Sequence, residues 1–148
     1  MEYDAIVIGA GPAGLSAAVF LSRANLNTLV IGDPEKSQLV TAQEVGNYIF
    51  ADGFSGRELL DRGVGQVQKY GATLLVNEAV HISKANSGFK IKTADANEYS
   101  AKSVLLAIGV SYVKSGIRNE KELSGKGVHY CVACDGWPYK SKRVIVVG

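Results

Sequence analysis

The sequence predicts an α/β fold in which a parallel sheet carries a β-hairpin or meander insertion and is followed by the start of a second domain. Three observations support this fold class. A strand, a helix and a second strand succeed one another between residues 3 and 31, a hairpin pattern lies between residues 80 and 93, and another apolar strand precedes Gly109. The first of these units implies two parallel strands joined by a right-handed crossover.

The first elements follow from composition and periodicity. Residues 3–8 (YDAIVI) form a short apolar run that predicts a buried strand. Residues 12–23 (PAGLSAAVFLSR) are rich in alanine and leucine and predict a helix, and residues 26–31 (LNTLVI) predict the second strand. Residues 37–54 show no clear period.

The next helix is indicated by its start. Ser55 and Glu58 have the spacing of a capping box, in which each side chain binds a backbone N–H of the other residue. Leu60, Val64 and Val67 then form the expected buried face.

Further along the chain the strand signals return. Residues 73–76 predict a short strand. Residues 80–84 and 89–93 alternate apolar and polar around the turn sequence Asn86-Ser87-Gly88, which predicts a hairpin. Residues 103–108 (SVLLAI) predict a buried strand.

The chain divides into two expected parts, residues 1–112 and residues 113–148. Residues 110–127 are polar, charged and glycine-containing, which predicts a linker. Residues 143–148 (RVIVVG) predict a buried strand that ends in glycine, as the first strand does.

Composition and charge narrow the function classes. The chain has 148 residues, of which 47% are hydrophobic and 20% charged, as in ordinary soluble domains. Its 16 basic and 14 acidic residues give a net charge of +2, too balanced to predict a nucleic acid or an anionic membrane as partner. No apolar run approaches a membrane span, and Glu2 and Asp4 interrupt any signal-type start. We therefore expect a cytoplasmic protein.

A glycine-rich turn joins the first strand to the first helix. Gly9, Gly11 and Gly14 form G-x-G-x-x-G, which permits a tight turn, close approach of a pyrophosphate, and close helix–sheet packing. The helix N-terminus offers N–H groups and partial positive charge to phosphates. Asp33 follows by about 20 residues, where an acid can bind ribose hydroxyls, and Glu35 competes for that role. The pattern predicts a dinucleotide site; a glycine turn without ligand is the alternative.

The only two cysteines form a C-x-x-C motif. Cys131 and Cys134 can close a small disulfide at the start of a helix, where a thiolate is stabilised. Reversible dithiol chemistry then becomes possible near neutral pH. Asp135 can deliver or remove the proton that such exchange needs.

Zinc binding is the competing interpretation of this motif. His129 and the two cysteines would supply three ligands, whereas a closed structural zinc site needs four. The other histidine, His81, falls in the hairpin and is expected to face solvent. We favour redox chemistry and no metal. Trp137 and Tyr139 are expected to be packing residues.

Along essentially its whole length the chain resembles the low-molecular-weight thioredoxin reductases, within the wider group of flavin disulfide reductases. Residues 9–14 resemble the FAD-pyrophosphate loop, and residues 35–39 (EKSQL) resemble the E-K-G-G-Q-L segment that wraps the flavin. Residues 44–48 (EVGNY) resemble E-V-E-N-Y/W, and residues 107–109 (AIG) resemble the A-T-G strand end. Residues 127–136 (GVHYCVACDG) resemble the redox signature G-V-S-x-C-A-T-C-D-G, the most specific of these matches.

The resemblance implies a fold, a reaction and a set of residues. It implies a Rossmann-like FAD-binding sheet followed by the start of a second nucleotide-binding domain. Electrons would pass from NADPH through FAD to the Cys131–Cys134 disulfide, and from the dithiol to thioredoxin or a thioredoxin-like protein, with Asp135 as the acid. The complete enzyme would be a homodimer in which one domain swings. The implied cofactor-binding residues are Gly9, Gly11, Pro12, Ala13, Gly14, Asp33, Glu35, Lys36, Gln38, Leu39, Asn47, Ala79, Ala107 and Gly109.

The sequence departs from the family pattern in a few places. Ser37 replaces a glycine in a loop that is one residue shorter, Gly46 stands where the family often has glutamate, and Ile108 stands where it has threonine. Residues 143–148 resemble the opening strand of the NADPH domain. We therefore expect an incomplete portion of the enzyme, without turnover of its own. A dinucleotide-binding module without catalysis, the flavoprotein component of a peroxide-reducing system, and an electron donor other than NADPH remain open.

Overall fold

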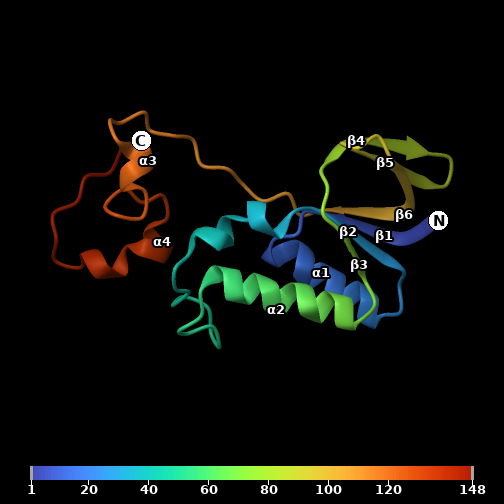
Figure 1. Cartoon of the computed structure of the whole chain (residues 1–148), viewed down its shortest axis with the longest axis horizontal. Helices are drawn as coiled ribbons and strands as arrows, with labels where there is room; N and C mark the ends of the chain where they lie inside the picture. Colours follow the sequence, from blue (N-terminus) through green and yellow to red (C-terminus); the bar gives the residue numbers. More distant parts are fainter. Residues whose placement is uncertain (1, 148) are drawn as a thin grey trace.

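The computed structural model describes residues 2–147 and has α/β architecture (Figure 1). Short 3-10 helices are labelled η. In chain order the elements are β1 (Glu2–Ile8), α1 (Pro12–Arg23), β2 (Thr28–Ile31), η1 (Pro34–Lys36), η2 (Gln38–Thr41), α2 (Gly56–Lys69), β3 (Thr73–Leu75), β4 (Ala79–Ala85), β5 (Gly88–Thr93), β6 (Glu98–Leu106), α3 (Glu120–Leu123), α4 (Val132–Asp135) and η3 (Trp137–Tyr139).

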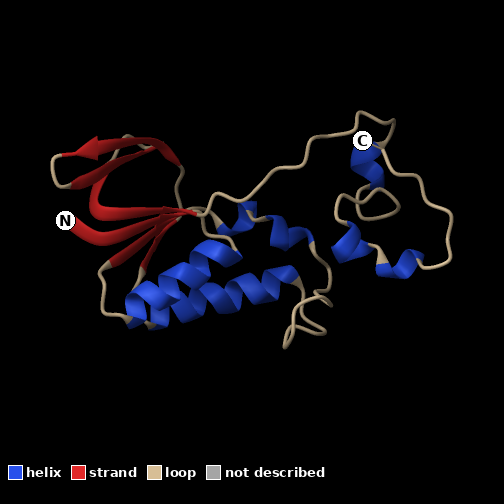
Figure 2. Cartoon of the chain, turned by 180° about the vertical axis from the view of Figure 1, so that it is seen from behind, coloured by secondary structure: helices blue, strands red, loops and turns tan. Residues whose placement is uncertain are grey.

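A six-stranded sheet organises the fold, in the order β3-β2-β1-β6-β5-β4. Strands β3, β2, β1 and β6 run parallel to one another, and β5 and β4 continue the sheet from β6 as an antiparallel meander. Helices α1 and α2 lie on one side of the parallel strands, and β4 and β5 curl over the other side (Figure 2). The predicted parallel sheet with a hairpin or meander insertion is therefore confirmed.

All of β2 and the second half of β1 are buried on both faces of the sheet. Successive side chains of a strand point to opposite sides, so each strand contributes to a cluster on either side. Val7 and Val30 join the core cluster beneath the two helices. Ile6, Leu29 and Ile31 face the meander, where they pack in a second cluster. Burial of each such side chain stabilises the fold by about 1.5–3 kcal/mol.

Helix α2 begins as its sequence predicts. The Ser55 hydroxyl accepts a hydrogen bond from the Glu58 N–H, and the Glu58 carboxylate accepts one from the Ser55 N–H at 2.8 Å. Leu60 and Val67 are buried as expected. The Gly63 position brings the two helices together, since a Cβ there would lie 3.1 Å from Leu15.

Two strand predictions need correction. Residues 143–147 were expected to form a buried strand, but they have no strand structure, and Ile145 is 91% exposed. A strand is stable only when a neighbour completes its hydrogen-bond ladder, and within residues 2–147 none pairs with this segment. The final glycine of the predicted strand lies outside the described residues. Strand β6 forms, but Leu106 at its paired end and Ile108 just after it are exposed rather than buried, because no described element covers their side chains.

The predicted linker is extended up to about Ile117 and then folds into the short helix α3. Figure 1 shows α3 and α4 well apart from the sheet and from α1 and α2. No helix among residues 2–147 is long and apolar enough to cross a membrane.

Candidate functional site

The three glycines of the turn after β1 have different structural roles. A Cβ on Gly9 would lie 2.1 Å from the Ala107 carbonyl oxygen, and Gly9 has φ of +111°. A Cβ on Gly14 would lie 1.9 Å from the Gly9 carbonyl oxygen and 3.3 Å from Val7. These two glycines are therefore required by the fold: one lets β1 end against the segment after β6, and the other lets α1 pack on the turn.

Gly11 has no such requirement. Its backbone angles, φ −81° and ψ −177°, suit any residue, and a Cβ there would make only ordinary contact with the Ser37 hydroxyl oxygen at 3.4 Å. Gly11 is also the N-cap residue of α1, and within the described chain no side chain caps this helix end. The space in front of Gly11 and the first-turn N–H groups thus form an open cradle suited to a pyrophosphate.

The two candidate ribose ligands after β2 already have partners. One carboxylate oxygen of Asp33 accepts a hydrogen bond from the Glu35 N–H at 3.0 Å, which makes Asp33 the N-cap of η1. The Glu35 carboxylate pairs with Arg57 of α2, and this hydrogen bond holds the pKa of Glu35 below its usual value. Each carboxylate keeps one oxygen for which no protein hydrogen bond is formed among residues 2–147, so either can still bind a hydroxyl.

The short helices η1 and η2 carry three further predicted residues, Lys36, Gln38 and Leu39. Leu39 is half-buried against the helices, and its N–H donates to the Ser37 hydroxyl at 3.3 Å. Lys36 makes an exposed ion pair with Glu78 at 3.8 Å, and Gln38 is exposed on η2.

Pro12, Ala13, Leu39 and Asn47 share a hollow of about 570 Å³ between α1, α2 and the η2 segment. Four of the predicted cofactor residues thus line one cavity. Val45 and Tyr48 of the EVGNY segment and Leu60 of the predicted helix face also line it. The sequence did not single out the remaining lining residues, because helix-face positions carry no motif; they are Leu15, Ser16, Val19, Leu59, Gly63 and Gln66.

Three further predicted residues lie at strand ends. The Ala107 N–H donates to the Ile8 carbonyl at 2.8 Å, which ties the end of β6 to the glycine turn. Gly109 is exposed with φ of +67°. Ala79 begins β4 and packs against the second core cluster. Ala107 therefore belongs to the same edge of the sheet as the cradle, as predicted for parallel strands.

Cys131 and Cys134 form a disulfide with a Cα–Cα distance of 5.2 Å, so the predicted pairing is confirmed. Cys131 is the N-cap of α4, and its sulfur accepts a hydrogen bond from the Cys134 N–H at 3.2 Å. An N–H directed at this sulfur favours the thiolate that forms on reduction. Helix α4, which contains Cys134, lies apart from α1 in Figure 1.

His129 and Tyr139 complete the surroundings of the disulfide. His129 Nε2 lies 2.9 Å from the Tyr139 hydroxyl, and His129 Nδ1 lies 3.5 Å from an Asp135 carboxylate oxygen. The sequence placed His129 beside the site but treated Tyr139 only as a packing residue. Trp137 was also expected to pack, yet it is 86% exposed, because the short η3 has no surface of the described chain to cover it.

A buried carboxylate anchors the segment that precedes the disulfide. Glu120 is 8% exposed and accepts hydrogen bonds from the N–H groups of Ser115 and Gly116, both at 2.9 Å, and from the Tyr130 hydroxyl. The Tyr130 hydrogen bond, followed by those N–H groups, holds the pKa of Glu120 below its usual value, and the same bond raises the pKa of Tyr130. Tyr130 also stacks on Tyr112. The residue before Cys131 is thus fixed to the linker.

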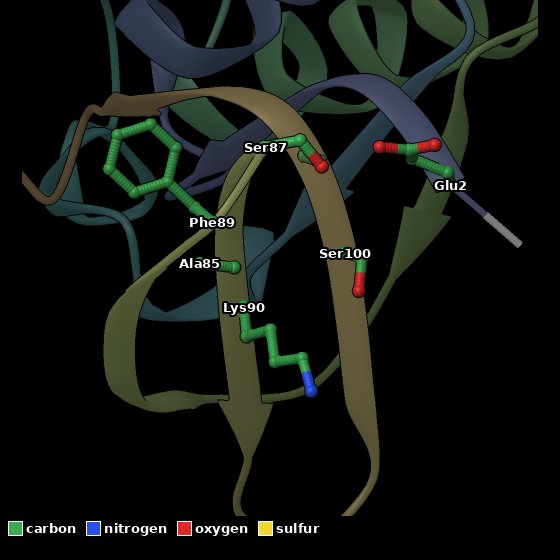
Figure 3. Close-up of a pocket in the computed structure, with 7 residues that line it drawn as sticks. Glu2, Ala85, Ser87, Phe89, Lys90 and Ser100 are labelled. Carbon is green, nitrogen blue, oxygen red and sulfur yellow. The ribbon is translucent and has the colours of Figure 1, made fainter.

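Elsewhere in the described chain there is one more hollow, but it is not lined by predicted site residues. A second hollow, of about 360 Å³, lies at the end of β1 opposite the glycine turn, beside β5 and β6 (Figure 3). Glu2, Phe89 and Lys90 contribute to its lining, but it contains no residue of the predicted site. Between residues 2 and 147 no group of three or more His, Cys, Asp or Glu side chains is arranged to hold a metal ion. His81 is exposed on β4, as predicted.

Comparison with known proteins gives consistent matches. Residues 3–148 match the pyridine nucleotide-disulphide oxidoreductase family. The chain is 41% identical to thioredoxin reductase of Bacillus subtilis and 40% identical to thioredoxin reductase of Listeria monocytogenes, over 99% of this chain and 46% of each relative. Among solved structures, a thioredoxin reductase from Giardia duodenalis superposes with a TM-score of 0.85 at 32% identity, over 92% of this chain and 45% of that one. The chain therefore spans about half the length of the relatives it matches.

Proposed function

The chain belongs to the pyridine nucleotide-disulphide oxidoreductase family, and from this premise we propose that it supplies the FAD-pyrophosphate site and the redox disulfide of a thioredoxin reductase. In this function NADPH is the electron source, and thioredoxin or a thioredoxin-like protein is the final acceptor. The working enzyme is a homodimer.

The observation that carries the proposal is the presence of two independent devices in one chain. Gly11 leaves an open cradle at the N-terminus of α1, and Cys131 and Cys134 form a disulfide at the start of α4. A dinucleotide-binding module without catalysis would need the cradle but would not need the disulfide. A flavin disulfide reductase needs both.

The residues around the cradle fit the dinucleotide. The first-turn N–H groups of α1 would bind the pyrophosphate, and Asp33 or Glu35 would bind the ribose. Pro12, Leu39 and Asn47 line the adjoining cavity, where a ring system can be held. When bound, FAD would supply the two-electron chemistry that reduces the disulfide.

The dithiol passes electrons on by exchange. One thiolate of the reduced pair attacks the partner's disulfide, forms a mixed disulfide and releases a partner thiolate. The second thiol of the pair then loses its proton and attacks the mixed disulfide, which restores the Cys131–Cys134 bond. Asp135 would move the protons that these two steps require. Because the disulfide lies apart from the cradle, the two sites must approach each other during turnover.

Binding of FAD is the first test. The purified chain is titrated with FAD, and quenching of flavin fluorescence together with a shifted visible spectrum is the expected result. Gly11→Val is the matched variant, since it fills the cradle at a position where a Cβ makes only ordinary contact with the protein. A chain that binds no flavin at any accessible concentration, or binds it equally well as Gly11→Val, contradicts the proposal. Turnover with NADPH and thioredoxin is then measured on the corresponding full-length protein, with Cys134→Ser as the inactive control.

A further inference from the structure

The side chains of Asp135, His129 and Tyr139 contact one another in a row, and Asp135 directly follows Cys134 of the redox disulfide. The imidazole of His129 lies between the other two, with Nδ1 3.5 Å from the Asp135 carboxylate and Nε2 2.9 Å from the Tyr139 hydroxyl. The histidine and tyrosine rings meet edge to face at a centroid distance of 5.3 Å. The Tyr139 contact is a hydrogen bond, and the longer Asp135 contact is an ion pair whenever the imidazole is protonated.

The local backbone holds this arrangement. Asp135 directly follows Cys134 and is the last residue of α4, with its N–H bonded to the Cys131 carbonyl at 2.9 Å. Gly136 lets η3 start at once after α4, because a Cβ there would lie 2.4 Å from the Val132 carbonyl oxygen. The tight connection brings Tyr139 back to His129.

The imidazole of His129 is also less exposed to solvent than the carboxylate that it contacts. The His129 side chain is 23% exposed, whereas Asp135 is 44% exposed. The titratable groups that face the imidazole are the Asp135 carboxyl and the Tyr139 phenol. The neighbouring Tyr130 hydroxyl is bonded to Glu120 instead.

We propose that His129 is a positioning residue that orients Asp135 and exchanges protons with it during dithiol–disulfide exchange, with Tyr139 fixing the imidazole. This inference rests on the proposed function of the disulfide. The reduced pair gives two electrons and two protons to a partner disulfide, so one S–S bond breaks, another forms and two partner thiols are released. Asp135 collects each proton that the pair's thiols lose and gives it to a departing thiolate. His129 holds the Asp135 carboxylate in a fixed orientation. By exchanging a proton with it, His129 also restores the protonation state of Asp135 before the next transfer.

A proton relay makes a prediction that depends on the leaving group. The rate of exchange depends on how readily the leaving thiolate departs. An alkyl thiolate is the more basic leaving group, since a cysteine thiol has a pKa of about 8.5, and it benefits from a proton donor. The thiolate released from dithiobis(nitrobenzoate) is stabilised by its aromatic ring and departs without one. A relay residue therefore matters for an alkyl disulfide and hardly matters for the aromatic one.

The experiment measures exchange rates of the reduced chain with hydroxyethyl disulfide and with dithiobis(nitrobenzoate) near neutral pH. We expect His129→Gln to slow the alkyl reaction about tenfold, at the low end of general acid–base effects, and to change the aromatic reaction less than about twofold. Tyr139→Phe should show the same split, more weakly. His81→Gln, which changes the chain's other histidine on the exposed face of β4, is the matched control and should change neither rate.

The variant Asp135→Asn distinguishes proton transfer through Asp135 from a purely structural effect of His129. If His129 acts through Asp135, the double variant His129→Gln/Asp135→Asn reacts with the alkyl disulfide no more slowly than Asp135→Asn alone. Additive effects, an equal slowing of both reactions by His129→Gln, or no slowing of either, would each overturn the inference. The assay contains no flavin, so these exchange rates can be measured whether or not the chain binds FAD. A failure to bind FAD would contradict the proposed function. If His129→Gln affects the alkyl and aromatic reactions alike, only the role of His129 is contradicted.

Discussion

Substitution of Gly11 tests the central distinction among the three glycines of the turn. A Cβ at Gly11 makes one ordinary contact, 3.4 Å from the Ser37 hydroxyl oxygen, and the backbone φ of −81° is normal for any residue. The structure therefore predicts that Gly11→Ala folds as well as the parent. The stability change should stay within about 1 kcal/mol, since reduced freedom of the unfolded chain offsets the slightly poorer helix cap.

The same Cβ should greatly weaken dinucleotide binding, because it occupies the space that lets phosphate oxygens reach the backbone N–H groups. A hydrogen bond to a charged group contributes about 1.5–3 kcal/mol. Loss of two such bonds weakens affinity by about 3–6 kcal/mol, which is a factor of about one hundred or more. Gly11→Val should lose at least as much.

Gly14→Ala is the contrasting variant. Its Cβ would lie 1.9 Å from the Gly9 carbonyl oxygen, so α1 must shift on the turn. We expect a loss of about 1–3 kcal/mol or more in the free energy of unfolding, as for other overpacked positions. Lost flavin binding in this variant would follow from damage to the fold rather than from a filled cradle.

Urea unfolding gives the stability of each variant, and a fluorescence titration with FAD gives its affinity. The reasoning is refuted if Gly11→Ala unfolds as readily as Gly14→Ala, because the space at Gly11 would then not be free. It is also refuted if Gly11→Val keeps the parent's affinity for FAD, because the cradle would then not hold the pyrophosphate.

Three other outcomes are expected. Gly65→Ala should raise the free energy of unfolding by about 0.5–1 kcal/mol, because a Cβ there meets open space inside α2, and thermal unfolding followed by circular dichroism would measure it. The bond between Glu120 and Tyr130 lowers the pKa of Glu120, so its stabilisation is present above the ordinary carboxyl range and is lost as the pH falls through the lowered pKa. The same bond raises the pKa of Tyr130, so Glu120→Gln should let one tyrosine ionise at lower pH in an ultraviolet titration; an unchanged titration curve would contradict the contact. Finally, the 148-residue chain by itself should not oxidise NADPH when FAD and a disulfide substrate are present. Residues 2–147 contain one strand–glycine turn–helix unit, and FAD would occupy it, so NADPH would not be held against the flavin. Steady turnover that depends on Cys131 would show this expectation to be wrong.

Local patterns predicted much of the fold and part of the candidate site. The capping pattern of Ser55 and Glu58 starts α2, and the glycine turn after β1 lies where its motif places it. The pairing of Cys131 with Cys134 also followed from their spacing. These features depend on contacts between residues close in the chain, so their physical cause is contained in a short stretch of sequence.

Tertiary structure decided what depends on residues far apart in the chain. It placed Ala107 against Gly9, which separates two glycines required by packing from Gly11, which is free to face a ligand. It also left residues 143–147 without the predicted strand. The sequence by itself determined which segments can form helices, strands and turns, because propensity and periodicity act locally. Only the folded chain decided which of them find partners, because a hydrogen-bond ladder or a close packing contact needs a second segment in place.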